Sequence, residues 1–216
     1  MDIPTVPPTA LDALSASVRR AALAALRDRE SATSVDALAS AVASRLSRSS
    51  ANGHADVDGM RRSLYHAHLP VLGQTGAVTF DPESGLVAAA NEPPFDEAWV
   101  GRLVTDHPDR EYDSLLDALA SARRQAVLYE LFIGESATVD ALADAVAVHE
   151  RDGAEASEPV SRVVGLSLAH IHLPLLADVG LVACDPAAET VHAGETAWRS
   201  HPWVGLSPIG EWAAVE

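Results

Sequence analysis

Apolar residues recur at helical spacing over three stretches of the chain, and each stretch returns about a hundred residues later. Residues 11–26 place Leu11, Leu14 and Val18 on one side of a helix, and residues 35–46 and 64–75 carry further stripes. Spacings of three and four residues predict amphipathic helices with one buried face. The counterparts are residues 116–131, 139–146 and 168–179. The pattern predicts two copies of a three-helix unit.

A period of two follows the third helix in both copies. Residues 77–80 and 86–88 alternate apolar and polar side chains around a turn that contains Pro82 and Gly85. Such alternation around a Pro-Gly turn predicts a β-hairpin, and residues 181–192 repeat it less regularly. The predicted fold class is therefore α+β, mainly α with small β-hairpins.

A proline interrupts the third helix of each copy. Pro70 and Pro174 have no N–H to donate, so the carbonyl of His66 or His170 loses its helical partner. A kink or a tightened turn is expected at these positions.

Sequence identity between the copies shows that the chain carries one module twice. Val-Asp-Ala-Leu-Ala at 35–39 returns at 139–143, and Trp-Val-Gly at 99–101 returns at 203–205, both displaced by 104 residues. The duplication predicts two domains of about 100 residues each. We expect a flexible N-terminal tail (1–8), a first repeat (9–105), a second repeat (106–207) and a C-terminal tail (208–216).

The charge composition points to a salt-adapted setting. All fifteen basic residues are Arg, against thirty-one Asp and Glu, which gives a formal net charge of −16. Such a surface stays hydrated where molar salt screens charges within about 3 Å. We therefore expect a halophilic archaeon as the source. With no apolar run long enough to span a bilayer and no signal-like N-terminus, we expect a cytoplasmic protein without a membrane partner.

The residues that could carry chemistry do not form a catalytic or metal site. Two histidines two residues apart on a helix point about 200° away from each other, so His66 and His68 cannot chelate one ion together. Cys184 is the only cysteine and is expected to be a small buried strand residue. The motifs of acyl transfer, phosphate binding and zinc hydrolysis do not occur. We predict a protein that is not an enzyme and has no cofactor and no metal.

Several strings of residues resemble a known family. The Arg-Arg pair at 19–20, Val-Asp-Ala-Leu-Ala at 35–39 and Leu-x-His-x-His-Leu-Pro at 64–70, with their copies, are similar to haloarchaeal winged helix-turn-helix domains, mostly of unassigned function. The resemblance covers about 80 residues of each copy. It implies two tandem winged helix-turn-helix domains and a regulatory or DNA-binding role.

The third helix of the first repeat is the predicted DNA reader. In helix-turn-helix proteins the N-terminal part of the later helix enters the major groove, and polar side chains position it on phosphates. Residues 1–92 carry eight Arg and ten acidic residues, whereas residues 93–216 carry seven and twenty-one. We therefore predict a DNA-binding transcriptional regulator whose first repeat contacts double-stranded DNA. The candidate residues are Arg61, Arg62, Tyr65, His66, Arg19 and Arg20, and the alternative for each Arg is a solvated surface position.

The alternative function is a non-catalytic protein-interaction or dimerisation module. The second repeat is acidic and its third helix begins with an apolar entry, and three of the four Trp lie in the last nineteen residues. Buried Trp commonly anchor interfaces, and the alternative is that these Trp cover the core of the second copy or the seam between the copies. The partner would be a second copy of this chain or another protein. The candidate interface residues are Val163, Val164, Leu166, Trp99, Trp198, Trp203 and Trp212.

Overall fold

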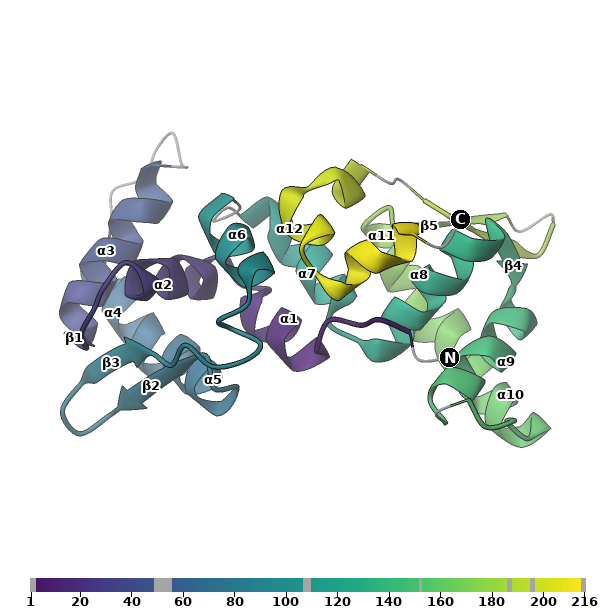
Figure 1. The fold of residues 1–216 in the computed structure, drawn as a ribbon, viewed down its shortest axis with the longest axis horizontal. Coiled ribbons are helices and arrows are strands. Elements are labelled where there is room, and N and C mark those ends of the chain that lie inside the picture. The colour runs from purple at the N-terminus through teal and green to yellow at the C-terminus, as the bar shows by residue number, and fades with distance from the viewer. Residues whose placement is uncertain are drawn as a thin grey trace. The chain divides into compact units, whose positions relative to one another are not determined.

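The chain folds into two compact units that match the two repeats except at their ends. The computed structural model describes residues 3–48, 56–106, 110–151, 153–185, 188–194 and 197–214. One unit comprises Thr9–Asp117, and the other combines Met1–Pro8 with Ala118–Glu216 (Figure 1). Each unit is mainly helical and contains one small antiparallel sheet.

The first unit builds its core from helices whose apolar stripes were predicted. Leu38 of the second stripe and Leu64 and Leu72 of the third are all fully buried, as is Trp99. Trp99 and Leu103 are buried on the helix Ala98–Asp106, and Phe95, which precedes that helix, is buried as well. The helices are α1 (Pro8–Leu14), α2 (Ser17–Arg27), α3 (Val35–Arg48), α4 (Val57–Ser63), η1 (Leu64–His68), α5 (Leu69–Gln74), α6 (Ala98–Asp106) and the short η2 (Arg110–Tyr112).

The second unit repeats this order and then closes with short helical turns. Leu142, Leu168 and Leu176 are buried at the positions equivalent to Leu38, Leu64 and Leu72. Its elements are α7 (Asp113–Leu119), which crosses the boundary between the units, α8 (Ala122–Gly134), α9 (Val139–His149), α10 (Glu158–Ser167), η3 (Leu168–His172), α11 (Leu173–Asp178), η4 (Ala197–Ser200), α12 (Pro202–Gly205) and η5 (Pro208–Ala214).

Both predicted hairpins are confirmed, and each gains a third strand. In the first unit β2 (Val78–Asp81) pairs with β3 (Leu86–Ala89), so that Phe80 lies opposite Val87, and β1 (Thr33–Ser34) pairs with the other edge of β3. In the second unit β5 (Val182–Asp185) pairs with β6 (Thr190–Ala193), and β4 (Ser136–Thr138) covers the far edge. The third strands are too short to show a period in the sequence.

The predicted first helix of each repeat is broken into two. α1 ends at Leu14 and α2 begins at Ser17, and the same break separates α7 from α8. The guanidinium of Arg20 donates a 2.7 Å hydrogen bond to the Leu14 carbonyl, and Ser121 accepts a 3.4 Å hydrogen bond from the Arg124 N–H. These bonds satisfy backbone groups that a helix end would otherwise leave without partners. An apolar stripe continues across such a break, so the pattern did not reveal it.

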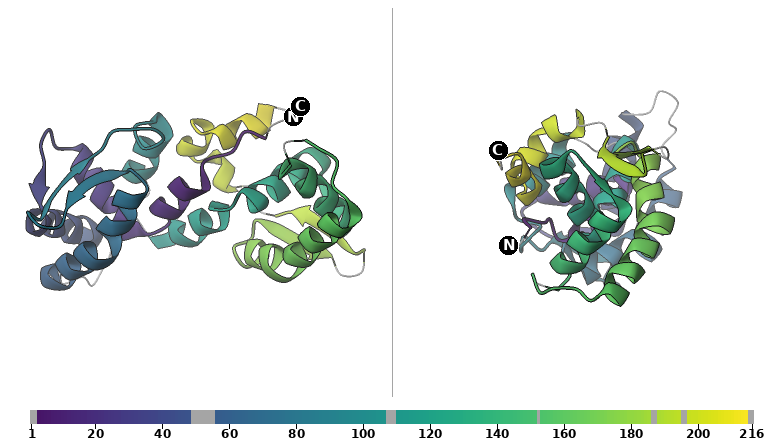
Figure 2. Two further views of the ribbon diagram at one scale, coloured as in Figure 1. Left: turned by 90° about the horizontal axis from the view of Figure 1, so that it is seen from below. Right: turned by 90° about the vertical axis from the view of Figure 1, so that its right-hand side faces the viewer.

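The two predicted tails are packed segments of the second unit. Val6 is fully buried. The Val6 N–H donates to Oε1 of Gln125 (3.0 Å), and Nε2 of Gln125 donates to the Val6 carbonyl (2.9 Å). Nε1 of Trp212 donates to the Pro4 carbonyl at 2.6 Å. Figure 2 shows the purple N-terminal segment running alongside the yellow C-terminal turns. The prediction of a flexible N-terminal tail was therefore wrong, and the boundary between the units lies at residue 118 rather than 106.

The prolines of the third helix widen the backbone rather than tighten it. The N–H of Leu69 donates to the carbonyl of Leu64, five residues earlier, and Leu173 and Leu168 repeat this bond. The π-helical turns η1 and η3 that result make room for the ring and the missing N–H of Pro70 and Pro174. A kink or a tightened turn was expected here. The position was right, but a tightened turn was wrong, because the backbone is wider at these residues.

The third helix of the second unit is unusually apolar for a helix with so little buried surface. By length and composition the run Glu158–Asp178, with a mean hydropathy of 1.4, could cross a membrane, and it is the one such helix among the described residues. Core helices of soluble proteins meet the same criterion. Here only 22% of the apolar window is buried, so most of this surface is open.

Candidate nucleic-acid interface

The third helix of the first unit is the continuous run of α4, η1 and α5, and it is distinct from α3. It presents an apolar inner side and a basic outer side. Asp56 caps its N-terminus by accepting a 2.8 Å hydrogen bond from the Gly59 N–H. Leu64, Leu69 and Leu72 are buried against the unit, whereas Arg61, Arg62 and His66 are exposed. Three of the six predicted DNA-contacting residues therefore share the open side of one helix.

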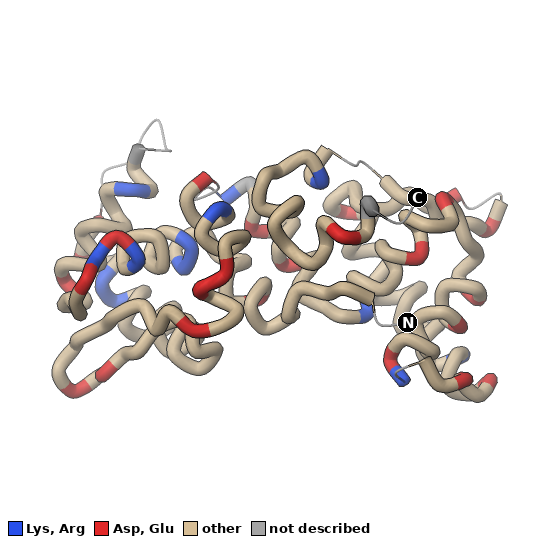
Figure 3. The backbone as a smooth tube through the Cα atoms, viewed as in Figure 1, with Lys and Arg blue, Asp and Glu red and all other residues tan. Residues whose placement is uncertain are grey.

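The two exposed arginines are held only weakly by their neighbours. Nε of Arg61 lies 3.5 Å from Oδ1 of Asp36, and Nε of Arg62 lies 3.4 Å from the Asp58 carbonyl. Exposed pairs of this kind contribute about 0–1 kcal/mol. Both guanidinium groups can therefore exchange these contacts for an incoming anion. Figure 3 shows basic segments on the helices of this unit and in the loop after α2, while the tip of the hairpin is acidic.

Tyr65 joins the third helix to the hairpin instead of reaching outward. Its hydroxyl donates to the Pro82 carbonyl at 2.9 Å, and its ring packs edge to face on Phe80, with 5.5 Å between centroids. The ring of His66 lies 5.0 Å from that of Tyr65. Tyr65 is half-buried and is best described as a positioning residue for the exposed His66.

The prediction that Arg20 contacts DNA was wrong. Arg20 is fully buried, donates to the Leu14 carbonyl and forms a 2.8 Å ion pair with Asp113. Arg19 is half-buried and donates to the carbonyls of Ala13 and Asp12, both at 2.5 Å. Burial lowers the pKa of Arg19, and the nearby acidic residues oppose that shift. Both side chains serve the junction between α1 and α2.

The second repeat holds the start of its core with side chains at the equivalent positions, which lie 105 residues later in this part of the chain. Arg123 makes a two-pronged pair with Glu150 at 2.6 and 2.7 Å, and this hydrogen bonding raises the pKa of Arg123. Arg124 is equivalent to Arg19 and donates to the carbonyl of Ala118, the residue equivalent to Ala13. Gln125 replaces Arg20 and donates to the Leu119 carbonyl at 2.9 Å. Because both copies use these positions to hold the start of the helical core, the residues indicate structure rather than binding.

The surface equivalent to the basic helix face is apolar in the second repeat. Val163 is 65% exposed and Leu166 is 58% exposed, and Leu166 occupies the position of Arg62. Ile171 is exposed as well, at the position of Ala67. Val164 is buried, so its predicted place in an interface was wrong. Val163 and Leu166 remain candidates.

The tryptophans predicted as interface anchors are core residues. Trp99 and Trp203 are fully buried, and Trp198 and Trp212 are buried around Phe132, with centroids 6.2 and 5.7 Å from its ring. The Arg199 guanidinium covers the same Phe132 ring, 4.0 Å from its centroid. The structure bears out the alternative interpretation for Trp198 and Trp212, because both pack around Phe132 of their own unit.

His68 and His172 are held in the uncharged form at equivalent positions. Each is half-buried beside the π-helical turn, and within the described residues the Nδ1 atom of each has no hydrogen-bond partner. Burial lowers the pKa of His68, and the Arg19 charge lowers it further. Burial, followed by Arg123 and Arg124, lowers the pKa of His172 in the same way.

These two histidines are expected to make the free energy of unfolding pH-dependent. Their folded-state pKa values lie below the ordinary value of about 6.5, so the unfolded chain takes up protons first as the pH falls. Their contribution is full above pH 6.5 and is lost as the pH falls through the folded-state pKa. In His68→Gln/His172→Gln the loss of stability between pH 7 and pH 5, measured by urea unfolding, should be smaller than in wild type. The exposed pair His66→Gln/His170→Gln is the control, and an unchanged pH dependence in the first variant would contradict the assignment.

One feature that the sequence did not suggest is a pocket beside the hairpin of the second repeat, lined in part by Cys184. Cys184 is exposed, so its predicted burial was wrong. The signal was present in the alignment of the copies, where Cys184 replaces Phe80 and Ala169 replaces Tyr65. Among the residues that the structure describes, no group of three His, Cys, Asp or Glu side chains could hold a metal ion.

Comparison with known proteins supports the duplication and gives no activity. A family model described as a domain of unknown function (DUF7344) matches residues 11–88 and again residues 116–192. No curated protein and no solved structure matched the chain.

Proposed function

Because the chain belongs to the DUF7344 family, through two domains whose function is unknown, we propose a function from its own geometry. We propose that both repeats are winged helix-turn-helix domains and that the chain is a DNA-binding transcriptional regulator. In this proposal the third helix of the first repeat lies in the major groove of double-stranded DNA. Arg61, Arg62 and His66 make the contacts, and Tyr65 holds the helix against the hairpin.

The single observation that carries this proposal is the difference between the repeats on one helix face. The scaffold residues Leu64, Leu69 and Leu72 have buried counterparts in the second repeat, whereas exposed Arg62 has become exposed Leu166. The same helix face is basic in one copy and apolar in the other. This difference indicates that the two copies have different functions. The order of three helices followed by a hairpin supports the same assignment.

The acidic residues around the basic face limit how DNA can approach. Ser84 donates to Asp81 at 2.6 Å, and this hydrogen bond, aided by the Glu83 N–H, lowers the pKa of Asp81. The hairpin tip therefore stays negatively charged and should be repelled by phosphates. Contact would be confined to the helix, with about two phosphates neutralised and a log–log salt slope of roughly −2. Such a shallow slope would let binding persist in concentrated salt.

Selection from a random duplex library, at several KCl concentrations, tests this proposal. The full-length protein should enrich a short motif, and footprinting should protect one half-site of a few base pairs. Protection of two half-sites about 34 Å apart would mean that both repeats read DNA. No enrichment at any salt concentration would contradict the proposal.

A protein-interaction function is the second candidate, and the exposed apolar residues of the second repeat favour it. Val163, Leu166 and Ile171 leave a long helix face open, and exposed apolar patches commonly mark interfaces. The partner would be a second copy of the chain or another regulator. A defined oligomer or co-purifying protein, together with no DNA retention, would select this function over the first.

We also propose a cytoplasmic setting in a halophilic archaeon. The support is compositional: the chain has fifteen Arg, no Lys and a net charge of −16. Binding measurements should therefore include molar KCl as well as dilute buffer.

A further inference from the structure

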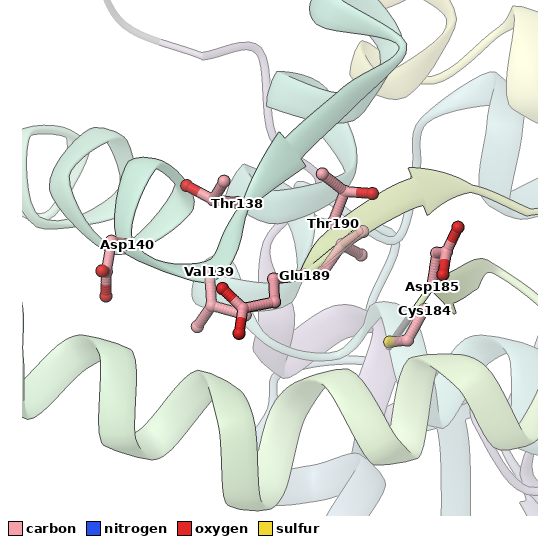
Figure 4. Close-up of a pocket in the computed structure, with 8 residues that line it drawn as sticks. Thr138, Val139, Asp140, Cys184, Asp185, Glu189 and Thr190 are labelled. Carbon is pink, nitrogen blue, oxygen red and sulfur yellow. The ribbon is translucent and has the colours of Figure 1, made fainter. Parts of the chain in front are cut away.

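The hairpin of the second repeat forms one wall of a pocket of about 500 Å³. This volume falls within the range of about 300–1,000 Å³ that is usual for small-molecule sites. Figure 4 shows Cys184 pointing from its strand towards the pale green helix below it, with Asp140 and Val139 contributed by the start of α9. The lining residues are Thr138, Val139, Asp140, Cys184, Asp185, Glu189, Thr190 and Val191.

The first repeat fills the equivalent space with its own aromatic side chains. There the Tyr65 ring packs on Phe80 and its hydroxyl reaches the Pro82 carbonyl. The residues 104 positions later are Ala169 and Cys184, so both rings are missing from the second repeat. A hollow of about 290 Å³ lies beside the first hairpin, and Phe80 is part of its wall.

The second repeat lacks the arginine that faces the start of α3 in the first repeat. Arg61 lies 3.5 Å from Asp36, the second residue of α3. Asp140 is the equivalent carboxylate on α9, but the residue equivalent to Arg61 is Gly165, which offers it no side chain. Asp185 and Glu189 add two further carboxylates, and none of the residues that line the pocket is basic.

We propose that this pocket binds a small organic cation that carries an aromatic ring, of the aromatic ammonium or guanidinium class. The ring takes the space that Tyr65 and Phe80 fill in the first repeat, in contact with the Cys184 thiol. The cation takes the position of the Arg61 guanidinium and binds Asp140 through a charge-assisted hydrogen bond. The site lies wholly within the second unit, so the inference holds whether or not the first repeat binds DNA.

Three small probes separate the ring from the charge. Phenethylammonium carries both, 3-phenylpropionate carries the ring with a negative charge, and propylammonium carries the charge without a ring. Titration of the full chain followed by NMR, in the lowest KCl that maintains the fold by circular dichroism, should give a Kd on the order of 1 mM for phenethylammonium. The other two probes should bind at least tenfold more weakly.

Refilling the pocket with the residues of the first repeat should abolish binding. The variant is Gly165→Arg/Ala169→Tyr/Cys184→Phe. A Cβ at Gly165 would lie 3.4 Å from Cβ of Ala143, an ordinary contact, so an arginine can be accommodated. Phenethylammonium affinity should fall at least tenfold in this variant. Val163→Ser, at an exposed position that does not line the pocket, is the matched control and should bind as wild type does.

The thiol of Cys184 gives a second readout that needs no variant. It is exposed and is the only cysteine of the chain, so alkylation by iodoacetamide reports on this site alone. Saturating phenethylammonium should slow alkylation at least fivefold, whereas propylammonium should leave the rate unchanged. Equal binding of 3-phenylpropionate, unchanged affinity in a folded refilled variant, or alkylation unaffected by phenethylammonium would each overturn the proposal. Binding confined to an Arg- and Tyr-containing peptide would overturn it in favour of a protein partner.

Discussion

Replacing Arg61 and Arg62 together with Ala is expected to reduce DNA affinity about 100-fold without changing the circular dichroism spectrum. A well-placed arginine contact to a base contributes about 1–3 kcal/mol, and each 1.4 kcal/mol is a factor of ten. Both side chains are exposed, and their contacts with Asp36 and the Asp58 carbonyl are weak, so the fold should not depend on them. Fluorescence anisotropy with the selected duplex, in a KCl series, measures the change.

The matched control for this variant is Arg102→Ala. Arg102 is 50% exposed and pairs with Asp106 on α6, so its loss removes one positive charge from the same unit, half of what the double variant removes. Affinity should change less than threefold. A similar loss in both variants would mean that net charge, rather than the third helix, governs binding. Retained binding in Arg61→Ala/Arg62→Ala would remove the third helix as the reader.

Replacing Arg20 with Ala is expected to lower the free energy of unfolding of the first unit by about 3 kcal/mol. The substitution leaves the Leu14 carbonyl without this donor, separates Asp113 from its partner and opens a cavity at a fully buried site. Breaking a buried ion pair on one side costs about 3–5 kcal/mol, and the lower end applies because Asp113 is 34% exposed and can be hydrated. Urea unfolding followed by circular dichroism measures the loss.

Arg62→Ala, which removes an exposed arginine from the same unit, serves as the stability control. Surface substitutions of this kind usually change stability by less than about 0.5 kcal/mol. The two variants should therefore have opposite signatures: Arg20→Ala alters stability, and Arg61→Ala/Arg62→Ala alters DNA affinity. A stable Arg20→Ala variant would contradict the structural role assigned to this side chain.

Local apolar periodicity was sufficient to predict the repeating elements of both units. The stripe through Leu64 and Leu72 and the alternation around Pro82 each depend on neighbouring residues, and the structure confirms a helix and a hairpin at those places. The order of the elements and the duplication followed from the same local signals. The two-residue strand β1 could not be predicted, because its pairing with β3 lies more than fifty residues away.

Polar side chains with distant partners account for most of what the sequence did not reveal. Gln125 binds Val6 across 119 residues, so a segment that reads as a tail belongs to the core of the second unit. Arg20 reads as a basic surface residue because its partner Asp113 is 93 residues away. In both cases the sequence shows the residue type, while burial and partner depend on the tertiary fold.

The two candidate sites, the basic helix face of the first repeat and the pocket of the second, also differ in how far the sequence reveals them. Exposed Arg61 and Arg62 were identified because they occupy the N-terminal part of the helix that enters the major groove in helix-turn-helix proteins. The pocket of the second repeat was missed because it arises from side chains that are absent, Ala169 and Cys184 in place of Tyr65 and Phe80. A comparison of the repeats for lost volume, as well as for changed charge, would have found it.

The central claim is that the third helix of the first repeat binds DNA, and crosslinking followed by genome-wide sequencing in the native host tests it most directly. The tagged wild-type chain should give discrete peaks that share the motif selected in vitro, and the Arg61→Ala/Arg62→Ala chain, at equal abundance, should lose them. Absence of peaks for the wild-type chain, or identical peaks for both chains, would contradict the claim.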